Sequence, residues 1–327
     1  MSLASGLNWF VRSFRPASQA RASEVLFPPN FLSSLERLRL VALKAIGGGL
    51  REGHRLGAYK GGQLEFHGHR NYVPGDELRY IDWNSFARLD KPYIKEFARE
   101  EAGIVHLLID ATPSMALGLP SKWDFSRRLA ALFSHVALSS KDRARMYLFK
   151  GAPHALEVFP ARGRRAGVRQ YLRFLEEQQL GAISEDSAVN PDHVLARAVD
   201  QFVRTQPERG RVILIGDFWF PEAEILGCIA RLSAAGFDVS VIHVLAPEEI
   251  LPDAEGNLLA RAIEESGEVE LQSSPDLPRR YAEELEHHRR GIEDAIRRRG
   301  GLYLFERSDT SIEHALIGTL RQRRWVM

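Results

Sequence analysis

A cluster of oxygen-bearing side chains follows an apolar run near the middle of the chain. The run is Ile104–Ile109, and Asp110, Thr112 and Ser114 come after it at alternate positions. Side chains spaced i, i+2 and i+4 on the bend after a strand can converge on one point, and Pro113 stiffens that bend. A ligand set made only of hard oxygens suits Mg²⁺ or Mn²⁺. The spacing therefore indicates a divalent metal site.

A second apolar run also ends in an aspartate. Arg211–Ile215 leads through Gly216 into Asp217, as Ile109 leads into Asp110. A carboxylate at the end of a buried strand is partly desolvated, so its charge needs a cation, a network of hydrogen-bond donors or a proton. The alternative interpretation is that both aspartates only cap helices and strand-end amides.

The strands that must position these aspartates are apolar along almost their whole length. Val239–Val244 and Leu302–Phe305 share this character, and amphipathic helical patterns separate the strands. Such an alternation is typical of a mainly parallel sheet that is covered on both faces, and Met146–Phe149 with Ala155–Phe159 predicts a hairpin. We therefore predict a doubly wound α/β fold, in which ligands bind outside the carboxyl ends of the strands.

The predicted organisation has three parts. Residues 1–29 are expected to be a flexible N-terminus, and residues 30–102 a helix followed by a β-rich segment. Residues 103–327 form the predicted α/β domain, with a two-stranded excursion near residues 256–271. The β-rich segment is expected to contain a turn and three short strands: Val73–Asp76, Gln63–Phe66, Leu78–Trp83 and Tyr93–Phe97.

Composition excludes several classes of protein. The chain has 327 residues, of which 44 are basic and 43 acidic, and this balance argues against nucleic acid as the main partner because phosphate-binding surfaces leave a basic excess. The single cysteine, Cys228, excludes an internal disulfide and a cysteine-based zinc site, and it makes the cytoplasm the expected compartment. No apolar run approaches the roughly 20 residues that span a bilayer, so we expect no transmembrane segment.

Two patterns resemble known families. Asp110-x-Thr112-x-Ser114 after an apolar strand resembles the metal-ion-dependent adhesion motif of von Willebrand factor type A domains. The stretch Arg70–Trp83 is similar to the signature of the domain-of-unknown-function 58 family, whose members join such a segment to a von Willebrand A-like domain. The likeness runs over about residues 30–325 and includes Ala87, Arg88, Glu265–Glu268, Tyr281, His288 and Ala315–Arg324.

The resemblance implies a Rossmann-like fold of von Willebrand A type and no established catalytic activity. The genes of the family typically lie beside those for MoxR-type AAA+ ATPases, with which its members are thought to act in chaperone-like assembly. The chain departs from the adhesion motif at its middle threonine, where it offers Asn190 and Asp192 as oxygen ligands. The implied ligands of Mg²⁺ or Mn²⁺ are three residues of the first loop and, through water, a later aspartate: Asp110, Thr112, Ser114 and Asp217.

Two further groups of polar residues have competing interpretations. His54, His67 and His69 could suggest zinc, but no cysteine or acidic pair completes the ligand set. The charged residues of the signature could form an interaction surface, or they could form a buried polar network that holds the β-rich segment on the main domain, with Trp83 and Phe86 as anchors. These charged residues are Asp76, Arg79, Asp82 and Arg88.

We predict a non-enzymatic adaptor that binds protein partners, by resemblance an AAA+ ATPase of MoxR type. A strand-end metal with incomplete protein coordination would accept a carboxylate of the partner as its last ligand. The alternative is a Mg²⁺-dependent haloacid-dehalogenase-like phosphohydrolase with Asp110 as the nucleophile and Asp217 on the metal. That chemistry usually needs a carboxylate where Thr112 stands, and a lysine that the sequence pattern does not place.

Overall fold

The computed structural model describes most of the chain between residues 26 and 312. The described residues form two units, one made of residues 64–99 and the other of residues 26–36 and 103–312, each with gaps. Among them, no helix has the length and apolar character needed to cross a membrane. The described residues are 26–29, 31, 33–36, 64–74, 76–99, 103–140, 142–151, 156–159, 167–181, 193–205, 207–250, 258–261, 268–271 and 277–312.

The larger unit contains a six-stranded, mainly parallel sheet. Its order is β10-β7-β6-β3-β4-β5, and only β5 runs antiparallel to its neighbour. From β3 the chain adds β4 on one side, whereas β6, β7 and β10 follow on the other, so the winding direction switches between β3 and β6. The predicted fold class is confirmed. The strands are β3 (Ile104–Asp110), β4 (Arg143–Phe149), β5 (Glu157–Phe159), β6 (Arg211–Gly216), β7 (Asp238–Leu245) and β10 (Leu302–Arg307).

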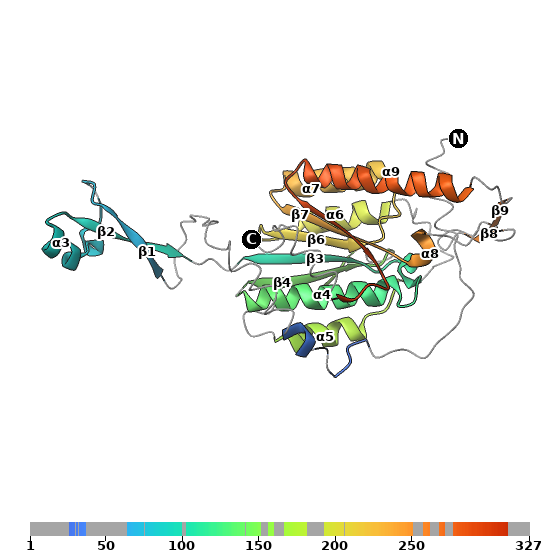
Figure 1. The fold of residues 1–327 in the computed structure, drawn as a ribbon, viewed down its shortest axis with the longest axis horizontal. Coiled ribbons are helices and arrows are strands. Elements are labelled where there is room, and N and C mark those ends of the chain that lie inside the picture. Colours follow the sequence, from blue (N-terminus) through green and yellow to red (C-terminus); the bar gives the residue numbers. More distant parts are fainter. Residues whose placement is uncertain are drawn as a thin grey trace. The chain divides into compact units, whose positions relative to one another are not determined.

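Helices cover both faces of this sheet, as its fully apolar strands require. Helices α4 (Lys122–Ser139) and α5 (Val168–Glu177) lie on one face. Helices α6 (Val194–Arg204), α7 (Glu222–Ala234) and α9 (Leu277–Arg297) lie on the other (Figure 1). Two short helices follow strand ends: η2 (Pro113–Ala116) after β3 and α8 (Pro247–Ile250) after β7.

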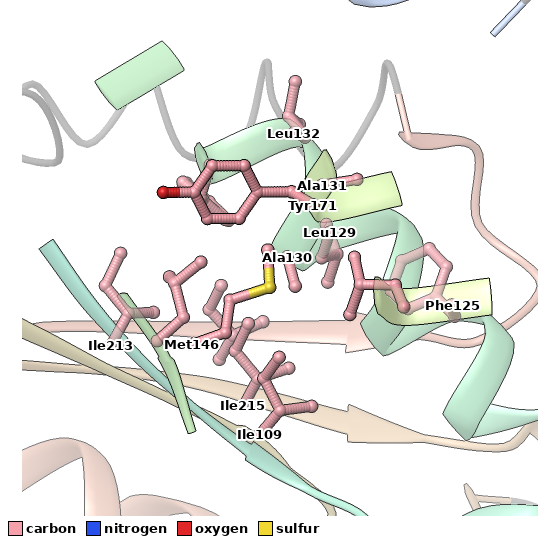
Figure 2. Close-up of a cluster of buried hydrophobic side chains, with 14 of the residues drawn as sticks. Ile109, Phe125, Leu129, Ala130, Ala131, Leu132, Met146, Tyr171, Ile213 and Ile215 are labelled. Atoms are coloured by element: carbon pink, nitrogen blue, oxygen red, sulfur yellow. The ribbon is translucent and has the colours of Figure 1, made fainter. Parts of the chain in front are cut away.

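The core beneath α4 joins strands, helices and a segment from before the sheet. Leu129 of α4 lies over Ile215 and Met146 of the strands, and Tyr171 of α5 closes the cluster (Figure 2). The Tyr171 hydroxyl donates to the carbonyl of Ala144 at 2.8 Å, which satisfies the polar end of an otherwise buried ring. Three residues of the early segment belong to the same core: Phe27, Phe31 and Leu35.

The smaller unit is built on an antiparallel pair, β1 (Leu64–Asn71) and β2 (Tyr93–Arg99). The predicted turn at Val73–Asp76 is confirmed, since the Asp76 amide donates to the Val73 carbonyl at 3.0 Å. The predicted strand Leu78–Trp83 is wrong. A 3-10 turn, η1 (Leu78–Tyr80), and helix α3 (Trp83–Leu89) take its place, because Asp82 accepts from the Asn84 amide and caps the helix.

The predicted excursion is present as strands β8 (Leu258–Arg261) and β9 (Glu268–Leu271), which pair antiparallel. Several expectations lie outside the described residues. These are the N-terminus to residue 25, most of the helix after Phe31, and the tail after residue 312.

Strand β3, which lies between β4 and β6, carries a buried histidine, His106. The ring of His106 is fully buried, donates from Nε2 to the Glu208 carbonyl at 2.8 Å, and has Nδ1 3.2 Å from the Tyr147 hydroxyl. Burial lowers the pKa of His106 to about 4, and the hydrogen bond to Glu208 opposes this shift only in part.

His106 predicts a loss of stability in mild acid. Between pH 6.5 and 4 the unfolded chain binds a proton on this ring that the native chain does not, so the free energy of unfolding falls as the pH falls through this window. We expect His106→Gln to remove up to about 1.4 kcal/mol per pH unit of that slope. Urea unfolding at a series of pH values measures it, with the exposed His287→Gln as control. Parallel curves for wild type and His106→Gln would contradict the assignment.

Candidate functional site

The two strand-end aspartates lie at the point where the winding of the sheet reverses. Strands β3 and β6 are parallel neighbours, and Ile109 pairs with Ile215 in their register. Asp110 is the last residue of β3, and Asp217 follows β6 directly. In doubly wound folds ligands bind at this switch point, so the topology brings both residues to the place where a site is expected.

The first-loop residues form a chain of hydrogen bonds. Asp110 Oδ1 accepts from the Thr112 amide at 2.9 Å and from the Thr112 hydroxyl at 2.6 Å. The Thr112 hydroxyl oxygen lies 3.0 Å from that of Ser114. Thr112 is the N-terminal cap of η2, and Pro113 begins this turn, so local geometry bends the chain back over the strand end. The structure thus brings Asp110, Thr112 and Ser114 together, all of them buried.

Asp217, the fourth predicted ligand, is bound by a lysine. Lys122 Nζ donates to Asp217 Oδ2 at 2.7 Å and to Glu249 Oε1 at 2.6 Å. The Lys122 side chain is 0% exposed, and the carboxylates are 1% and 2% exposed. The three residues come from different elements, since Lys122 opens α4, Asp217 follows β6 and Glu249 lies in α8. We call these three residues the buried charge triad.

The position of Lys122 is unfavourable apart from its two partners. Burial disfavours an ammonium group, and the first turn of a helix carries a partial positive charge that repels it. Burial by itself lowers the pKa of Lys122. The negative charges and hydrogen bonds of Asp217 and Glu249 outweigh burial and raise the pKa above its ordinary value. Lys122 therefore stays charged, and the two carboxylates account for its presence in the core.

Further hydrogen bonds fix the carboxylates of the buried charge triad. Asp217 Oδ1 accepts from the Trp219 amide at 3.3 Å, and the Trp219 indole donates to Glu249 Oε1 at 3.2 Å. Glu249 Oε2 accepts from the Ala246 amide at 2.7 Å. Each carboxylate oxygen therefore has a donor, and the Trp219 ring is itself held by stacking on the ring of His288, with centroids 5.6 Å apart.

The arrangement of these groups does not fit a divalent ion held by all four predicted ligands. An ammonium group 2.7 Å from Asp217 Oδ2 already occupies the position of a cation and would repel a metal placed beside it. Within the described part of the chain, no group of three or more histidine, cysteine or acidic side chains could hold a metal ion. Thr112 and Ser114 supply only neutral oxygens beside Asp110. The metal at these residues therefore stays a prediction.

Sequence reasoning missed two residues of the site, Lys122 and Glu249. Glu249 follows the apolar strand β7 by a few residues, as Asp217 follows β6, and this repeated strand-end carboxylate was a usable signal. Lys122 gave none, because lysine is almost always exposed and stands here next to the polar cap Ser121. Asn190 and Asp192, the candidates for the middle ligand, lie outside the described residues.

In the smaller unit, the signature aspartates serve its own fold. Asp82 is buried and accepts from Ser85 Oγ at 2.7 Å, and its carboxylate lies 2.7 Å from His69 Nε2. Both oxygens of Asp76 accept from the Arg70 guanidinium at 2.6 Å. These bonds hold the pKa of both aspartates at about 2, through Ser85 for Asp82 and through Arg70 for Asp76. The ring of His69, one of the three histidines that could suggest zinc, belongs to this network.

Large apolar side chains are exposed in the smaller unit, three of them on α3. Among the described residues of the whole chain, seven large hydrophobic side chains are exposed, and five of them lie within residues 73–89. Trp83 is 62% exposed, and its ring contacts that of Phe86 edge to face with centroids 6.1 Å apart. We call the five residues the apolar cluster: Val73, Leu78, Trp83, Phe86 and Leu89.

Comparison with known proteins identifies relatives along most of the chain. A family model described as "Protein of unknown function DUF58" matches residues 68–291, which confirms the predicted membership. The uncharacterized protein Rv1480 of Mycobacterium tuberculosis (strain ATCC 25618 / H37Rv) is 28% identical over 306 residues, covering 89% of this chain and 92% of that protein. The uncharacterized protein Mb1516 of Mycobacterium bovis matches with the same values.

Solved structures give a weaker likeness. The conserved hypothetical protein BatB from Bacteroides thetaiotaomicron is 19% identical, and the match covers 68% of this chain and 98% of that chain with a TM-score of 0.39. The SpRpn10 VWA domain is 12% identical, and its match covers 69% of this chain and 97% of that chain, also with a TM-score of 0.39.

Proposed function

The chain belongs to the DUF58 family, and on that premise we propose that it is a non-enzymatic adaptor that binds an AAA+ ATPase of MoxR type in the cytoplasm. Its role would be to work with the ATPase in chaperone-like assembly, as the resemblance to this family suggests. The proposal depends most on one observation, the apolar cluster on the smaller unit.

The apolar cluster supports a protein-binding role because its own unit leaves it uncovered. Trp83 and Leu89 are 62% and 58% exposed, although removal of such side chains from water is favourable by about 25 cal/mol for each square ångström. Exposed apolar patches on soluble proteins mark interaction sites, and tryptophan is enriched at the centres of protein interfaces. Asp82, the N-terminal cap of α3, is bonded to Ser85 of the helix and to His69 of β1, so the three cluster residues on α3 start from an end that is tied to the strand pair.

We expect Trp83→Ala to weaken binding of the MoxR-type ATPase about 30-fold or more. An aromatic residue at the centre of an interface typically contributes at least about 2 kcal/mol, which corresponds to this factor. Titration calorimetry with both purified proteins measures the affinity. Trp83→Phe, which keeps an aromatic ring, should retain most of the affinity.

Val158→Ala is the matched control, because Val158 is also an exposed apolar residue but lies on β5 of the other unit. It should leave the affinity unchanged. A Trp83→Ala variant that binds the ATPase as wild type does, but melts at a lower temperature, would contradict the proposal. That outcome would favour the other interpretation of the signature, in which Trp83 and Phe86 anchor the segment on the main domain.

One observation keeps the phosphohydrolase as a second candidate function. The lysine that this chemistry usually needs now has a counterpart in Lys122, which binds Asp217. Against it, Asp110 is fully buried, and the position where a general acid is needed holds Thr112, which donates to Asp110. An assay with an aryl phosphate separates the two functions, since Mg²⁺-dependent turnover that is lost in Asp110→Asn would favour the enzyme.

A further inference from the structure

We propose that Lys122 supplies, from within the chain, the positive charge that a divalent metal would supply at this strand end. Its ammonium group would tie the loops after β3, β6 and β7 together, so that they assemble without metal. This inference goes beyond the proposed function, because it concerns the state of the site in the free chain and requires no partner.

The ammonium group of Lys122 lies between two carboxylates. One atom, Lys122 Nζ, lies 2.7 Å from Asp217 Oδ2 and 2.6 Å from Glu249 Oε1. It therefore joins carboxylates that follow two neighbouring strands, β6 and β7, while its own helix follows β3 through η2. A bound divalent cation likewise holds together the carboxylates that are its ligands.

Every carboxylate oxygen of the buried charge triad has a hydrogen-bond donor within the chain. None of the side chains of the triad is more than 2% exposed, so bulk solvent screens these charges only weakly. The Trp219 indole and the amides of Trp219 and Ala246 donate hydrogen bonds to the remaining acceptor positions of the carboxylates. A divalent cation at Asp217 would take this partner from Lys122 and leave the buried ammonium group with Glu249 alone, which is unfavourable.

The place of Lys122 in the chain is one that a helix does not favour for a lysine. Lys122 is the first residue of α4, where the helix dipole disfavours a cation, and the N-cap bond from the Asp124 amide to Ser121 forms without it. The helix therefore has no need of a lysine at this position. The two buried carboxylates, Asp217 and Glu249, are the groups that a cation at this position stabilises.

The test is a metal titration of wild type and Lys122→Met, a variant that keeps the apolar stem and removes the charge. We expect Mn²⁺ to bind Lys122→Met, because Asp217 and Glu249 then face one another without a cation. Millimolar Mn²⁺ should raise the melting temperature of Lys122→Met by about 5 °C or more. In wild type, neither Mn²⁺ nor EDTA should shift it, and electron paramagnetic resonance should show only free Mn²⁺.

Two controls make the result specific. Lys150→Met removes a lysine whose ion pair with Glu157 is partly exposed, and Mn²⁺ should not stabilise this variant. Lys122→Met combined with Asp217→Asn lacks one of the two carboxylates and should lose the response to Mn²⁺. Bound Mn²⁺ in wild type that disappears in Asp110→Asn would overturn the proposal, and so would a folded Lys122→Met that binds no Mn²⁺. If Lys122→Met does not fold, the wild-type resonance and EDTA measurements decide.

Discussion

Asp217→Asn should lower the free energy of unfolding by about 3 kcal/mol or more, within the range measured when one partner of a buried ion pair is removed. The amide keeps the size of the side chain but takes away half of the negative charge that Lys122 faces at 0% exposure. Glu249 remains as the second partner, so we place the loss near the lower end of that range. Urea unfolding followed by circular dichroism measures the change.

The matched control for Asp217→Asn is Glu157→Gln. It also removes a lysine's carboxylate partner, at the same 2.7 Å distance, but the pair of Lys150 and Glu157 is 26% and 42% exposed. Exposed pairs contribute at most about 1 kcal/mol, so the control should cost little. Equal losses from the two substitutions would show that burial adds nothing to the pair with Lys122, and would contradict the energetic role of the triad.

Neutralising all three charges separates the cost of an unpaired charge from the value of the pair. In Lys122→Met with Asp217→Asn and Glu249→Gln, no charge is left buried alone. Replacement of a buried ion network by uncharged groups of similar size is often close to neutral, so this variant should be more stable than Asp217→Asn. If the triple variant were less stable than Asp217→Asn, the attraction within the triad would exceed the cost of its desolvation.

The sheet and its switch point could be predicted from the sequence because fully apolar strands give an unambiguous signal. Apolar runs such as Ile104–Ile109 and Arg211–Ile215 predict strands in the interior of a sheet, and an aspartate follows each run. Because the strands are parallel, Asp110 and Asp217 lie at the same end of the sheet. The hydrogen bonds among Asp110, Thr112 and Ser114 were also within reach, because they depend on local spacing.

Two features could not be predicted, for separate physical reasons. The pairing of Lys122 with Glu249 joins residues 127 positions apart, and although Glu249 follows a strand end as Asp217 does, nothing in the sequence around Lys122 indicates that it is buried. The interval Leu78–Trp83 has apolar residues spaced as in a strand, but the capping bond of Asp82 starts a helix at Trp83. The Asp82 amide also donates to the carbonyl of Tyr93 in β2, a contact that the sequence pattern does not reveal.

Gly216→Ala should cost about 3 kcal/mol, because Gly216 makes room for Asp110. A β-carbon at position 216 would lie 2.7 Å from the Asp110 β-carbon and 3.0 Å from Asp110 Oδ2. Strands β3 and β6 are each paired on both sides, so neither can move away without disturbing a second ladder. Overpacking of this kind costs about 1–3 kcal/mol, and weakening of the bonds from Thr112 to a buried carboxylate adds to it.

Gly227→Ala provides the opposite case within the same fold. Gly227 lies inside α7, and a β-carbon there would meet no atom within 4 Å. Alanine in a helix interior is favoured over glycine by up to about 1 kcal/mol, so this variant should be more stable than wild type. The two glycine substitutions should therefore change the free energy of unfolding in opposite directions when measured by the same urea titration. A Gly216→Ala variant as stable as wild type would mean that Asp110 can leave its position freely, and the strand-end site would then lack the fixed geometry from which its chemistry is inferred.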